Sequence, residues 1–300
     1  MSITVSSARR PAFGDLLERD ADLRRVLAER GVAVDALQPL AQGRSAPIRR
    51  LRCDTGTGSG LLIELAASEA GSRQLRNEAS GRRWAAAAGV RTPAVVGHDP
   101  AGGWLVGEAA APAVRDVAYV DAVLEQAELI GAAAVAPPPS HDTRSWESSP
   151  LTRVARASLV AAGGLSVPLF LRSRRAYHAL AFDRPVHGDF YYLNVLRDPR
   201  GRATVVDWEY LGWGPRFSDA LRMWASLPER HLRDHLVDRL LEQCSTPRAR
   251  AQLGVVARWM VVRQIGENLS SLRHRSRESL AHARSMLPEA LALAESLGVR

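Results

Sequence analysis

The first third of the chain combines short apolar runs with two helical patterns. Residues 13–30 carry apolar side chains at near-helical spacing and end before Gly31, which predicts a leading helix with a glycine stop. The second helical pattern covers residues 72–88. Short strands joined by turns are predicted where apolar runs of strand length occur, at 37–40, 48–53, 61–66, 95–96 and 104–108.

Beyond residue 112 the pattern is mostly helical. Helical spacing covers six segments, at 117–135, 151–162, 167–182, 229–243, 248–273 and 277–297. One hairpin interrupts them, because strand-like runs at 193–197 and 202–206 flank a turn-forming Asp198-Pro-Arg-Gly201. We therefore expect a small first lobe over residues 1–112 and a larger helical lobe over 113–300, which contains the hairpin region 185–209.

The hairpin region offers three side chains that suit phosphoryl transfer. Asp189 precedes the first strand, Asn194 lies at its start and Asp207 follows the second strand. Because the strands of a hairpin run antiparallel, Asn194 and Asp207 are expected at the same end. The reaction needs one carboxylate to accept a hydroxyl proton, and hard oxygen ligands to hold Mg²⁺ against the nucleotide phosphates. The pattern thus predicts Asp189 as the catalytic base and Asn194 with Asp207 as metal ligands.

These residues resemble a known family. His187-Gly188-Asp189, then Asn194, then Asp207-Trp208-Glu209 is similar to the H-G-D-x-x-x-x-N and D-W-E signatures of the aminoglycoside phosphotransferase and choline kinase family, relatives of the protein kinases. The resemblance implies an α+β, two-lobed protein-kinase-like fold, with a small antiparallel-sheet lobe that has one main helix and a larger, mostly helical lobe. It also implies His187 beside Asp189 in the catalytic motif, and ATP or GTP with Mg²⁺ as cofactors. The alternative for the same residues is a buried histidine and two aspartates that cap turns.

The resemblance also assigns residues to nucleotide binding. It implies a phosphate-covering loop that contains Gly43, Arg44 and Ser45, and a helix glutamate at Glu78. It places a hinge near 108–112, where the backbone around Glu108 and Ala110 would meet the base. Gly56-Thr-Gly58-Ser-Gly60 is a competing glycine-rich stretch, but its position between two strand-like runs predicts a hairpin turn.

The chain contains no lysine: all of its 40 basic residues other than histidine are arginine. This excludes Schiff-base chemistry and a Walker A lysine, and it removes the strand-three lysine that kinases use on the nucleotide. The resemblance places Glu64 at that lysine position. An arginine from the loop or the neighbouring strand is expected to supply the charge, with Arg52 as the first candidate and Arg44 as the second, and Arg50 on the same strand face as Arg52. The alternative is that Glu64 points away.

The composition of the chain limits the classes of binding partner that we expect. A formal charge of +8 and a pI near 10.5 would be compatible with nucleic-acid binding. However, the arginines are spread along the chain with no aromatic-interleaved basic run, so we expect no nucleic-acid partner. No apolar run approaches the roughly 18 residues of a membrane span, and the N-terminus lacks a signal-peptide pattern. We expect a cytoplasmic protein that does not bind membranes. Cys53 and Cys244 lack metal-ligand spacing and are expected to be reduced.

The charge balance of the second lobe bears on the acceptor. From residue 228 onward, eight acidic residues face twelve arginines, which favours a neutral or anionic small-molecule hydroxyl acceptor over a polycation. Three hypotheses remain: an ATP-dependent O-phosphotransferase for an antibiotic or other metabolite, a kinase-like enzyme that phosphorylates Ser or Thr of a peptide, and an inactive nucleotide-binding or scaffolding protein, which the missing lysine supports.

Overall fold

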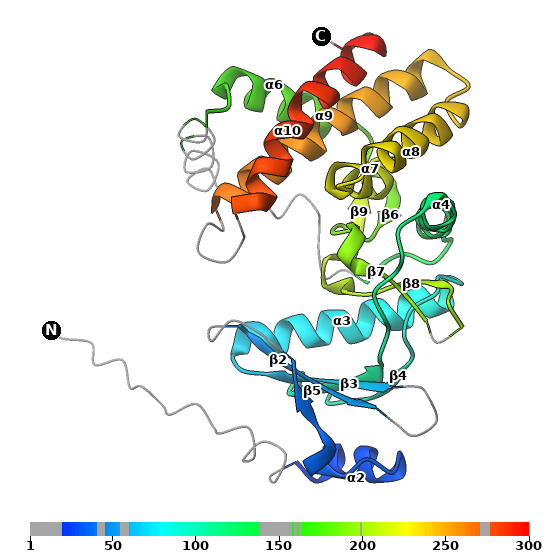
Figure 1. Ribbon diagram of the computed structural model, residues 1–300, viewed down its shortest axis with the longest axis vertical. Coiled ribbons are helices and arrows are strands. Elements are labelled where there is room, and N and C mark those ends of the chain that lie inside the picture. Colours follow the sequence, from blue (N-terminus) through cyan, green and yellow to red (C-terminus); the bar gives the residue numbers. More distant parts are fainter. Residues whose placement is uncertain are drawn as a thin grey trace, which may run out of the picture. The chain divides into compact units, whose positions relative to one another are not determined.

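The structure is a computed structural model that describes residues 20–40, 46–54, 60–138, 158, 161, 164–198, 200–270 and 277–299. Residue contacts divide the chain into two units (Figure 1). Unit 1 comprises Met1–Ala79 and Pro93–Ala110, and unit 2 comprises Ser80–Thr92 and Ala111–Arg300. The expected lobes, 1–112 and 113–300, stay a prediction.

Unit 1 is built on one antiparallel sheet in the order β1-β2-β3-β5-β4. Its strands are β1 (Gln38–Pro39), β2 (Ile48–Asp54), β3 (Gly60–Ala66), β4 (Val95–His98) and β5 (Trp104–Glu108). Leu61, Ile63 and Leu65 alternate along β3 toward one face, where they pack with residues of α2 (Ala21–Glu29). The other face packs against α3 (Glu69–Ala87), whose residues belong to both units (Figure 1). The sheet is therefore covered on both sides.

Helix α2 has clear start and stop signals. Asp20 is its N-cap and accepts a hydrogen bond from the backbone N of Leu23 at 2.9 Å. Gly31 follows the helix with φ +67°, a conformation that glycine adopts without strain. The predicted glycine stop is confirmed, while the part of the expected helix before Asp20 lies outside the described residues.

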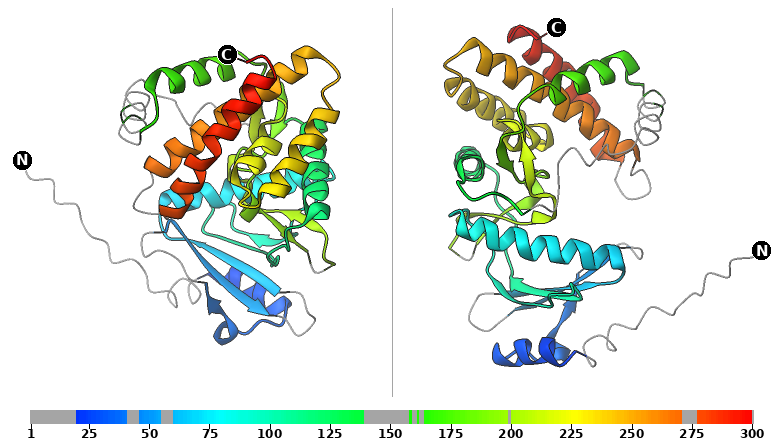
Figure 2. Two further views of the ribbon diagram at one scale, coloured as in Figure 1. Left: turned by 45° about the horizontal axis from the view of Figure 1, so that its top comes forward. Right: turned by 180° about the vertical axis from the view of Figure 1, so that it is seen from behind.

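Unit 2 is mostly helical (Figure 2). Its longest described helices pack on one another, with α9 in contact with α6, α7 and α10, and α8 in contact with α4 and α7. They are α4 (Val117–Ala132), α6 (Val167–His178), α7 (Ser218–Ser226), α8 (Arg230–Glu242), α9 (Pro247–Ser270) and α10 (Arg277–Ser296). Two small antiparallel pairs complete it: β6 (Arg184–Val186) with β9 (Gly212–Gly214), and β7 (Val195–Arg197) with β8 (Ala203–Val205).

The expected α+β fold class is confirmed, with an antiparallel sheet followed by a mostly helical remainder. Most of the helix predicted over 151–162 lies outside the described residues. The strand predicted over 193–197 is wrong at its start, because Tyr192–Asn194 form the 3-10 turn η3. That turn connects the buried Phe190 segment to β7. Within the described residues, no helix is both long and apolar enough to cross a membrane.

A close approach at Gly81 fixes α3 beside the residue that follows Asp207. A Cβ at Gly81 would lie 2.5 Å from the Cβ of Trp208 and 2.9 Å from its carbonyl oxygen. Trp208 itself is fully buried, and its indole lies 6.1 Å from the ring of Trp84 on α3. Only glycine allows this contact, so the sequence of α3 helps to position the Asp207 backbone.

We predict that Gly81→Ala destabilises the protein by about 1–3 kcal/mol, the usual cost of overpacking. Because each kcal/mol shifts the melting temperature of a chain of this size by roughly 2–4 °C, calorimetry measures the effect directly. Gly131→Ala in α4 is the matched control, since the nearest atom to its new Cβ is 4.0 Å away. The control should melt no lower than the wild type, because alanine favours helix over glycine. Equal melting of all three proteins would contradict the packing described here.

Candidate active site

The β7–β8 hairpin brings Asn194 and Asp207 together. Val195 pairs with Val205, and the backbone N of Val206 donates to the carbonyl of Asn194 at 2.9 Å. The two site residues therefore share one end of the hairpin, and Asn194 Nδ2 lies 3.5 Å from Asp207 Oδ2. The predicted proximity is confirmed.

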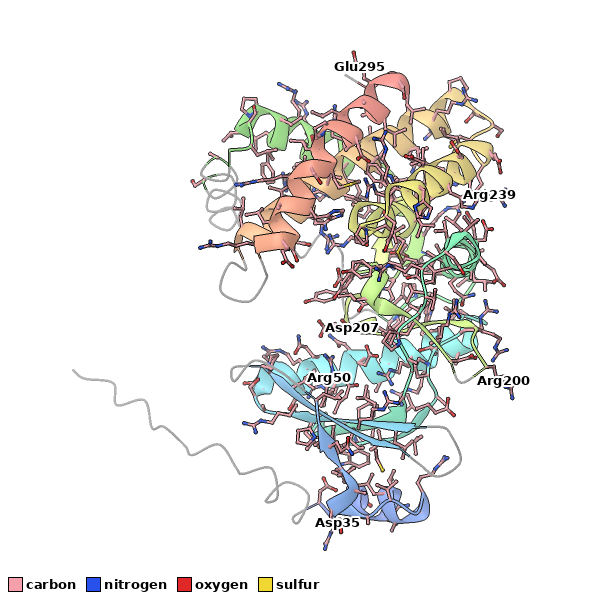
Figure 3. All side chains as sticks on the ribbon, viewed as in Figure 1. Asp35, Arg50, Arg200, Asp207, Arg239 and Glu295 are labelled. Carbon is pink, nitrogen blue, oxygen red and sulfur yellow. The ribbon has the colours of Figure 1, made fainter. Side chains whose placement is uncertain are left out.

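The backbone at Asp207 turns sharply. Asp207 has φ +67° and ψ +56°, the left-handed region that costs a non-glycine residue on the order of 1 kcal/mol. Packing of the next residue offsets that cost, because Trp208 is buried and its Nε1 donates to Val205 O and to Thr92 Oγ1, each at 3.0 Å. The turn ends β8 and keeps the Asp207 carboxylate beside Asn194; Asp207 is labelled in Figure 3.

A second hydrogen bond ties Asn194 to the segment that carries Asp189. Asn194 Nδ2 donates to the main-chain carbonyl of Asp189 at 2.9 Å. The amide nitrogen is thus engaged by both partners, and among the described residues no protein donor is bound to Asn194 Oδ1. Asn194 is 5% exposed, and the two hydrogen bonds of its Nδ2 fix the orientation of the side chain.

Asp219 holds the backbone of the His187–Asp189 loop. Its carboxylate accepts from the backbone N of His187 at 2.8 Å and of Gly188 at 3.2 Å. Burial raises the pKa of Asp219, and the hydrogen bonds from the backbone of His187 and Gly188 and the positive charge of Arg263 oppose that rise. The N-cap of α7 is Phe217, so Asp219 acts on the loop and not as a helix cap.

His187 links the loop to the end of β8. The imidazole is fully buried; its Nε2 lies 2.9 Å from the carbonyl of Val206, and its Nδ1 accepts from the backbone N of Asp189 at 3.3 Å. This pattern fits the neutral ring with the proton on Nε2. Gly188 between them has φ +84°, and a Cβ there would lie 2.4 Å from Tyr210 O. Each of these contacts restrains the backbone at Asp189.

The buried side chain of Arg222 binds the Asp189 carboxylate. Arg222 Nη2 lies 2.8 Å and Nε 3.3 Å from Asp189 Oδ1, and the same Nη2 is 2.7 Å from Glu267 Oε2. Arg263 continues the series, because its Nε donates to Glu267 Oε1 at 2.8 Å and its Nη2 to Gly188 O at 3.4 Å. Two carboxylates and two guanidinium groups therefore alternate through the interior of unit 2.

This alternation fixes the charge state of Arg222. Burial alone would lower its pKa, but the carboxylates of Glu267 and Asp189 raise it above the usual range. The side chain of Arg222 is 5% exposed and that of Asp189 is 15% exposed. A permanent cation thus holds one oxygen of Asp189, in a position from which water is largely excluded.

Sequence analysis missed Arg222, Glu267 and Arg263. A signal was present, because Arg222 lies three residues after Asp219 on α7 and Arg263 lies four residues before Glu267 on α9, spacings that place side chains on one helix face. That the two helices bring these pairs to Asp189 depends on tertiary packing. No local pattern contains that information.

In unit 1 the acid at the expected lysine position is buried and paired. Glu64 lies on β3 with 2% exposure, and Arg50 from β2 reaches its Oε1 with Nε at 2.7 Å. Glu78 on α3 is 4% exposed. Arg50 is thus the arginine that pairs with Glu64, whereas Arg52 is the first candidate from the sequence; that an arginine supplies the charge of the missing lysine to the nucleotide stays a prediction. Arg52 lies two residues further along β2, opposite Leu62, and its role stays a prediction.

Most backbone groups of the predicted hinge are hydrogen-bonded to other described residues. The backbone N groups of Glu108 and Ala109 donate to Ala94 O and Gly60 O, and Ala111 exchanges two hydrogen bonds with Arg197. Within the described part of the chain, no backbone hydrogen bond involves Ala110. The Glu108 side chain is exposed, so its expected contribution is through the backbone. Gly43, Arg44 and Ser45 lie outside the described residues.

The family assignment follows from a comparison with family models. The model described as the phosphotransferase enzyme family matches residues 7–253, which is most of the chain. The chain belongs to this family. The match spans the loop, the hairpin, Asp219 and Arg222, while Arg263 and Glu267 lie beyond its end.

Solved structures show the same fold in proteins of low sequence identity. A thermostable mutant of aminoglycoside phosphotransferase APH(4)-Ia, in its apo form, aligns with TM-score 0.63 and 17% identity over 90% of this chain and 98% of that one. A choline/ethanolamine kinase family protein from Mesorhizobium loti gives 0.59 and 18% over 91% and 95%. The GDP and kanamycin complex of APH(2")-IIIa gives 0.57 and 12% over 91% and 99%. The expected protein-kinase-like fold is confirmed, and no curated protein sequence matches.

We predict that Arg222→Met lowers both stability and turnover. Removing the cation leaves the Asp189 carboxylate without its partner and Glu267 with Arg263 alone, at a cost of about 3–5 kcal/mol, and it releases the Asp189 side chain. The matched control is Arg233→Met, since Arg233 is similarly buried and pairs with Glu289 at 3.0 Å away from the loop. Both variants should have a lower melting temperature than the wild type. Only Arg222→Met should lose turnover per folded molecule, and equal turnover in the two variants would contradict the role given to Arg222.

Proposed function

We propose that the protein transfers the γ-phosphoryl group of ATP or GTP to a hydroxyl group of a small molecule. One observation carries the proposal: the Asn194 amide nitrogen joins the main chain at Asp189 to the carboxylate of Asp207, at 2.9 and 3.5 Å. The base and both metal ligands expected from the sequence are thereby held in one rigid arrangement. Phosphoryl transfer depends on such positioning and on charge neutralisation more than on covalent catalysis.

Asp189 is proposed as the base. Arg222 engages Oδ1, and this leaves Oδ2 to accept the proton of the acceptor hydroxyl. The hydroxyl oxygen then attacks the γ-phosphorus, the bond from phosphorus to the bridging oxygen breaks, and the nucleoside diphosphate departs with the electron pair. His187, buried and hydrogen-bonded at both ring nitrogens, is proposed to position the loop from which Asp189 projects.

Asn194 and Asp207 suit Mg²⁺. A carboxylate and an amide oxygen are hard ligands, and Mg²⁺ is usually bound by one or two such groups together with waters and substrate phosphates. The described residues contain no group of three or more His, Cys, Asp or Glu that could hold a metal, which agrees with a site that the nucleotide completes. When bound, Mg²⁺ would neutralise charge on the phosphates, and Asn194 Oδ1 with the Asp207 carboxylate would hold it.

The acceptor class remains open within small molecules. Similar folds were solved with hygromycin B and with kanamycin, which are aminoglycosides, so the preference for a neutral or anionic acceptor inferred from charge gains no support from them. A screen should therefore include aminoglycosides beside neutral and anionic alcohols. ADP and GDP occur in the same relatives, and both triphosphates should be supplied. Because these nucleotides are available in the cytoplasm, we propose that the protein acts there.

The main competitor is a non-catalytic nucleotide-binding protein. The absence of lysine favours it, because the kinase reaction normally places a lysine on the nucleotide phosphates. The pairing of Asp189, Asn194 and Asp207 opposes it, since binding alone does not require a base. A peptide-directed kinase stays the second alternative. Incubation with labelled nucleotide, pooled metabolites and peptides separates all three.

We predict that Asp189→Asn lowers the transfer rate about 10²–10⁴-fold, the usual contribution of a positioned base, while the dissociation constant for Mg²⁺-nucleotide stays within about twofold. The base does not ligate the metal, so binding should survive. The measurement is turnover with the acceptor found in the screen, beside calorimetric titration with nucleotide. Undiminished turnover in the variant would overturn the assignment of Asp189.

We predict that Asp207→Asn weakens Mg²⁺-nucleotide binding about 10- to 100-fold, as expected when a charged contact is lost. Asn194→Ala should weaken it less, because the amide oxygen is neutral. Asp198→Asn in the hairpin turn is the control and should leave binding unchanged, since the hydrogen bonds of the Asp198 side chain to described residues go to Arg200 and Arg202. Titrations at several Mg²⁺ concentrations provide the test, and the metal role fails if all four proteins bind nucleotide alike.

A further inference from the structure

Two carboxylates are buried in one layer of unit 1, between the sheet and α3. Glu64 alternates with Ala66 along β3, so both face the same side, and Glu78 lies one helical turn after Leu75 on α3. Ala66 and Leu75 belong to one packed cluster. Glu64 is 2% exposed and Glu78 is 4% exposed. Burying two acids in one layer is costly without a cation close by.

Arg50 provides that cation from the neighbouring strand. It lies directly opposite Glu64 in the β2–β3 register, and it shares the α3 side of the sheet with Ile48 by strand alternation (Figure 3). Its Nε is 2.7 Å from Glu64 Oε1. Glu64 and Arg50 are thus held together by backbone pairing as well as by charge, so the position of the guanidinium is determined by the fold.

The two members of this pair differ greatly in exposure. The side chain of Glu64 is 3% exposed, whereas that of Arg50 is 41% exposed. One edge of the guanidinium is therefore anchored on a buried carboxylate, while much of the side chain remains within reach of a ligand. A guanidinium has five donors in a planar fork and matches the oxygens of phosphate groups. Such a cation is oriented before a ligand arrives, which lowers the entropy cost of binding.

We propose that Arg50, oriented by Glu64, binds the phosphate groups of the nucleotide and replaces the strand lysine of kinases. The inference rests on the proposed function. In kinases a lysine on the third strand pairs with a helix glutamate; here the acid is on β3 and the cation is on β2, one strand away. This placement of the cation on β2 also explains how an acid at Glu64 is compatible with a bound triphosphate, because Arg50 balances the charge of Glu64.

The first test compares Arg50→Ala with the double variant R50A/E64Q. Nucleotide affinity is measured by calorimetric titration with Mg²⁺-ATP or Mg²⁺-GTP, and folding by the melting temperature. Arg50→Ala leaves Glu64 buried without this partner, so its melting temperature should be lower than that of the wild type. It should also bind the Mg²⁺-nucleotide about 10- to 100-fold more weakly, the loss expected for a charged contact. R50A/E64Q removes the buried charge and should recover the melting temperature but not the affinity. If the double variant also recovers the affinity, Arg50 is only the structural partner of Glu64 and the proposal is overturned.

The second test returns the cation to β3. R50A/E64K should bind Mg²⁺-nucleotide more tightly than R50A/E64Q by about tenfold or more, since a cation beside Glu78 restores the usual arrangement. Arg49→Ala is the control on the same strand, and it should leave affinity unchanged because alternation turns Arg49 to the other face. Equal affinity in the two double variants, or a loss in Arg49→Ala as large as in Arg50→Ala, would contradict the proposal.

The design separates this inference from the proposed function. Adenosine or guanosine, which lacks phosphates, should bind the wild type and R50A/E64Q equally if Arg50 acts on the phosphates. If affinity for the triphosphate is unchanged in R50A/E64Q while turnover still depends on Asp189, the inference is wrong and the proposed function stands. If the wild type binds no nucleotide, the proposed function fails and the inference falls with it.

Discussion

The carboxylate of Asp219 is the contact on which the proposed site depends most. It holds the backbone N groups of His187 and Gly188 at 2.8 and 3.2 Å from a buried position. The loop that it holds carries Asp189, and Asn194 is in turn bound to the Asp189 carbonyl. A backbone segment of irregular shape can be buried only if its polar groups are paired, so one aspartate on α7 allows the loop to lie in the interior. The Arg222–Glu267–Arg263 series then orients the side chain that projects from that loop.

Much of this arrangement could be predicted from the sequence. Asn194 and Asp207 flank a hairpin whose turn residues are evident, and antiparallel pairing requires that they meet. Gly31 marks the end of α2, because a glycine after a helical pattern commonly takes positive φ, as it does here at +67°. The fold class followed from the His187 to Glu209 signatures, which occur in a fixed order and spacing. These features are local, and local features are what spacing and turn chemistry encode.

The rest depends on contacts between residues far apart in the chain. Arg222 and Glu267 are separated by 45 positions, and only the packing of α7 against α9 makes them partners. The pairing of Arg50 with Glu64 required the register of β2 and β3, which a one-residue slip would have reversed. Strand β6 with its partner β9 was missed because three-residue strands carry no periodic signal. Long-range pairing of charges, and not local propensity, therefore decides the chemistry that we propose.

The central claim is that Asp189, Asn194 and Asp207 have distinct roles toward a magnesium nucleotide. A high-resolution crystal structure with Mg²⁺ and the slowly hydrolysed analogue AMP-PNP tests it most directly. The account predicts a metal ion at about 2.0–2.1 Å from a carboxylate oxygen of Asp207 and from Oδ1 of Asn194, with Asp189 outside the coordination shell and still bound by Arg222. A metal ion ligated by Asp189, or one bound without Asp207, would contradict the account.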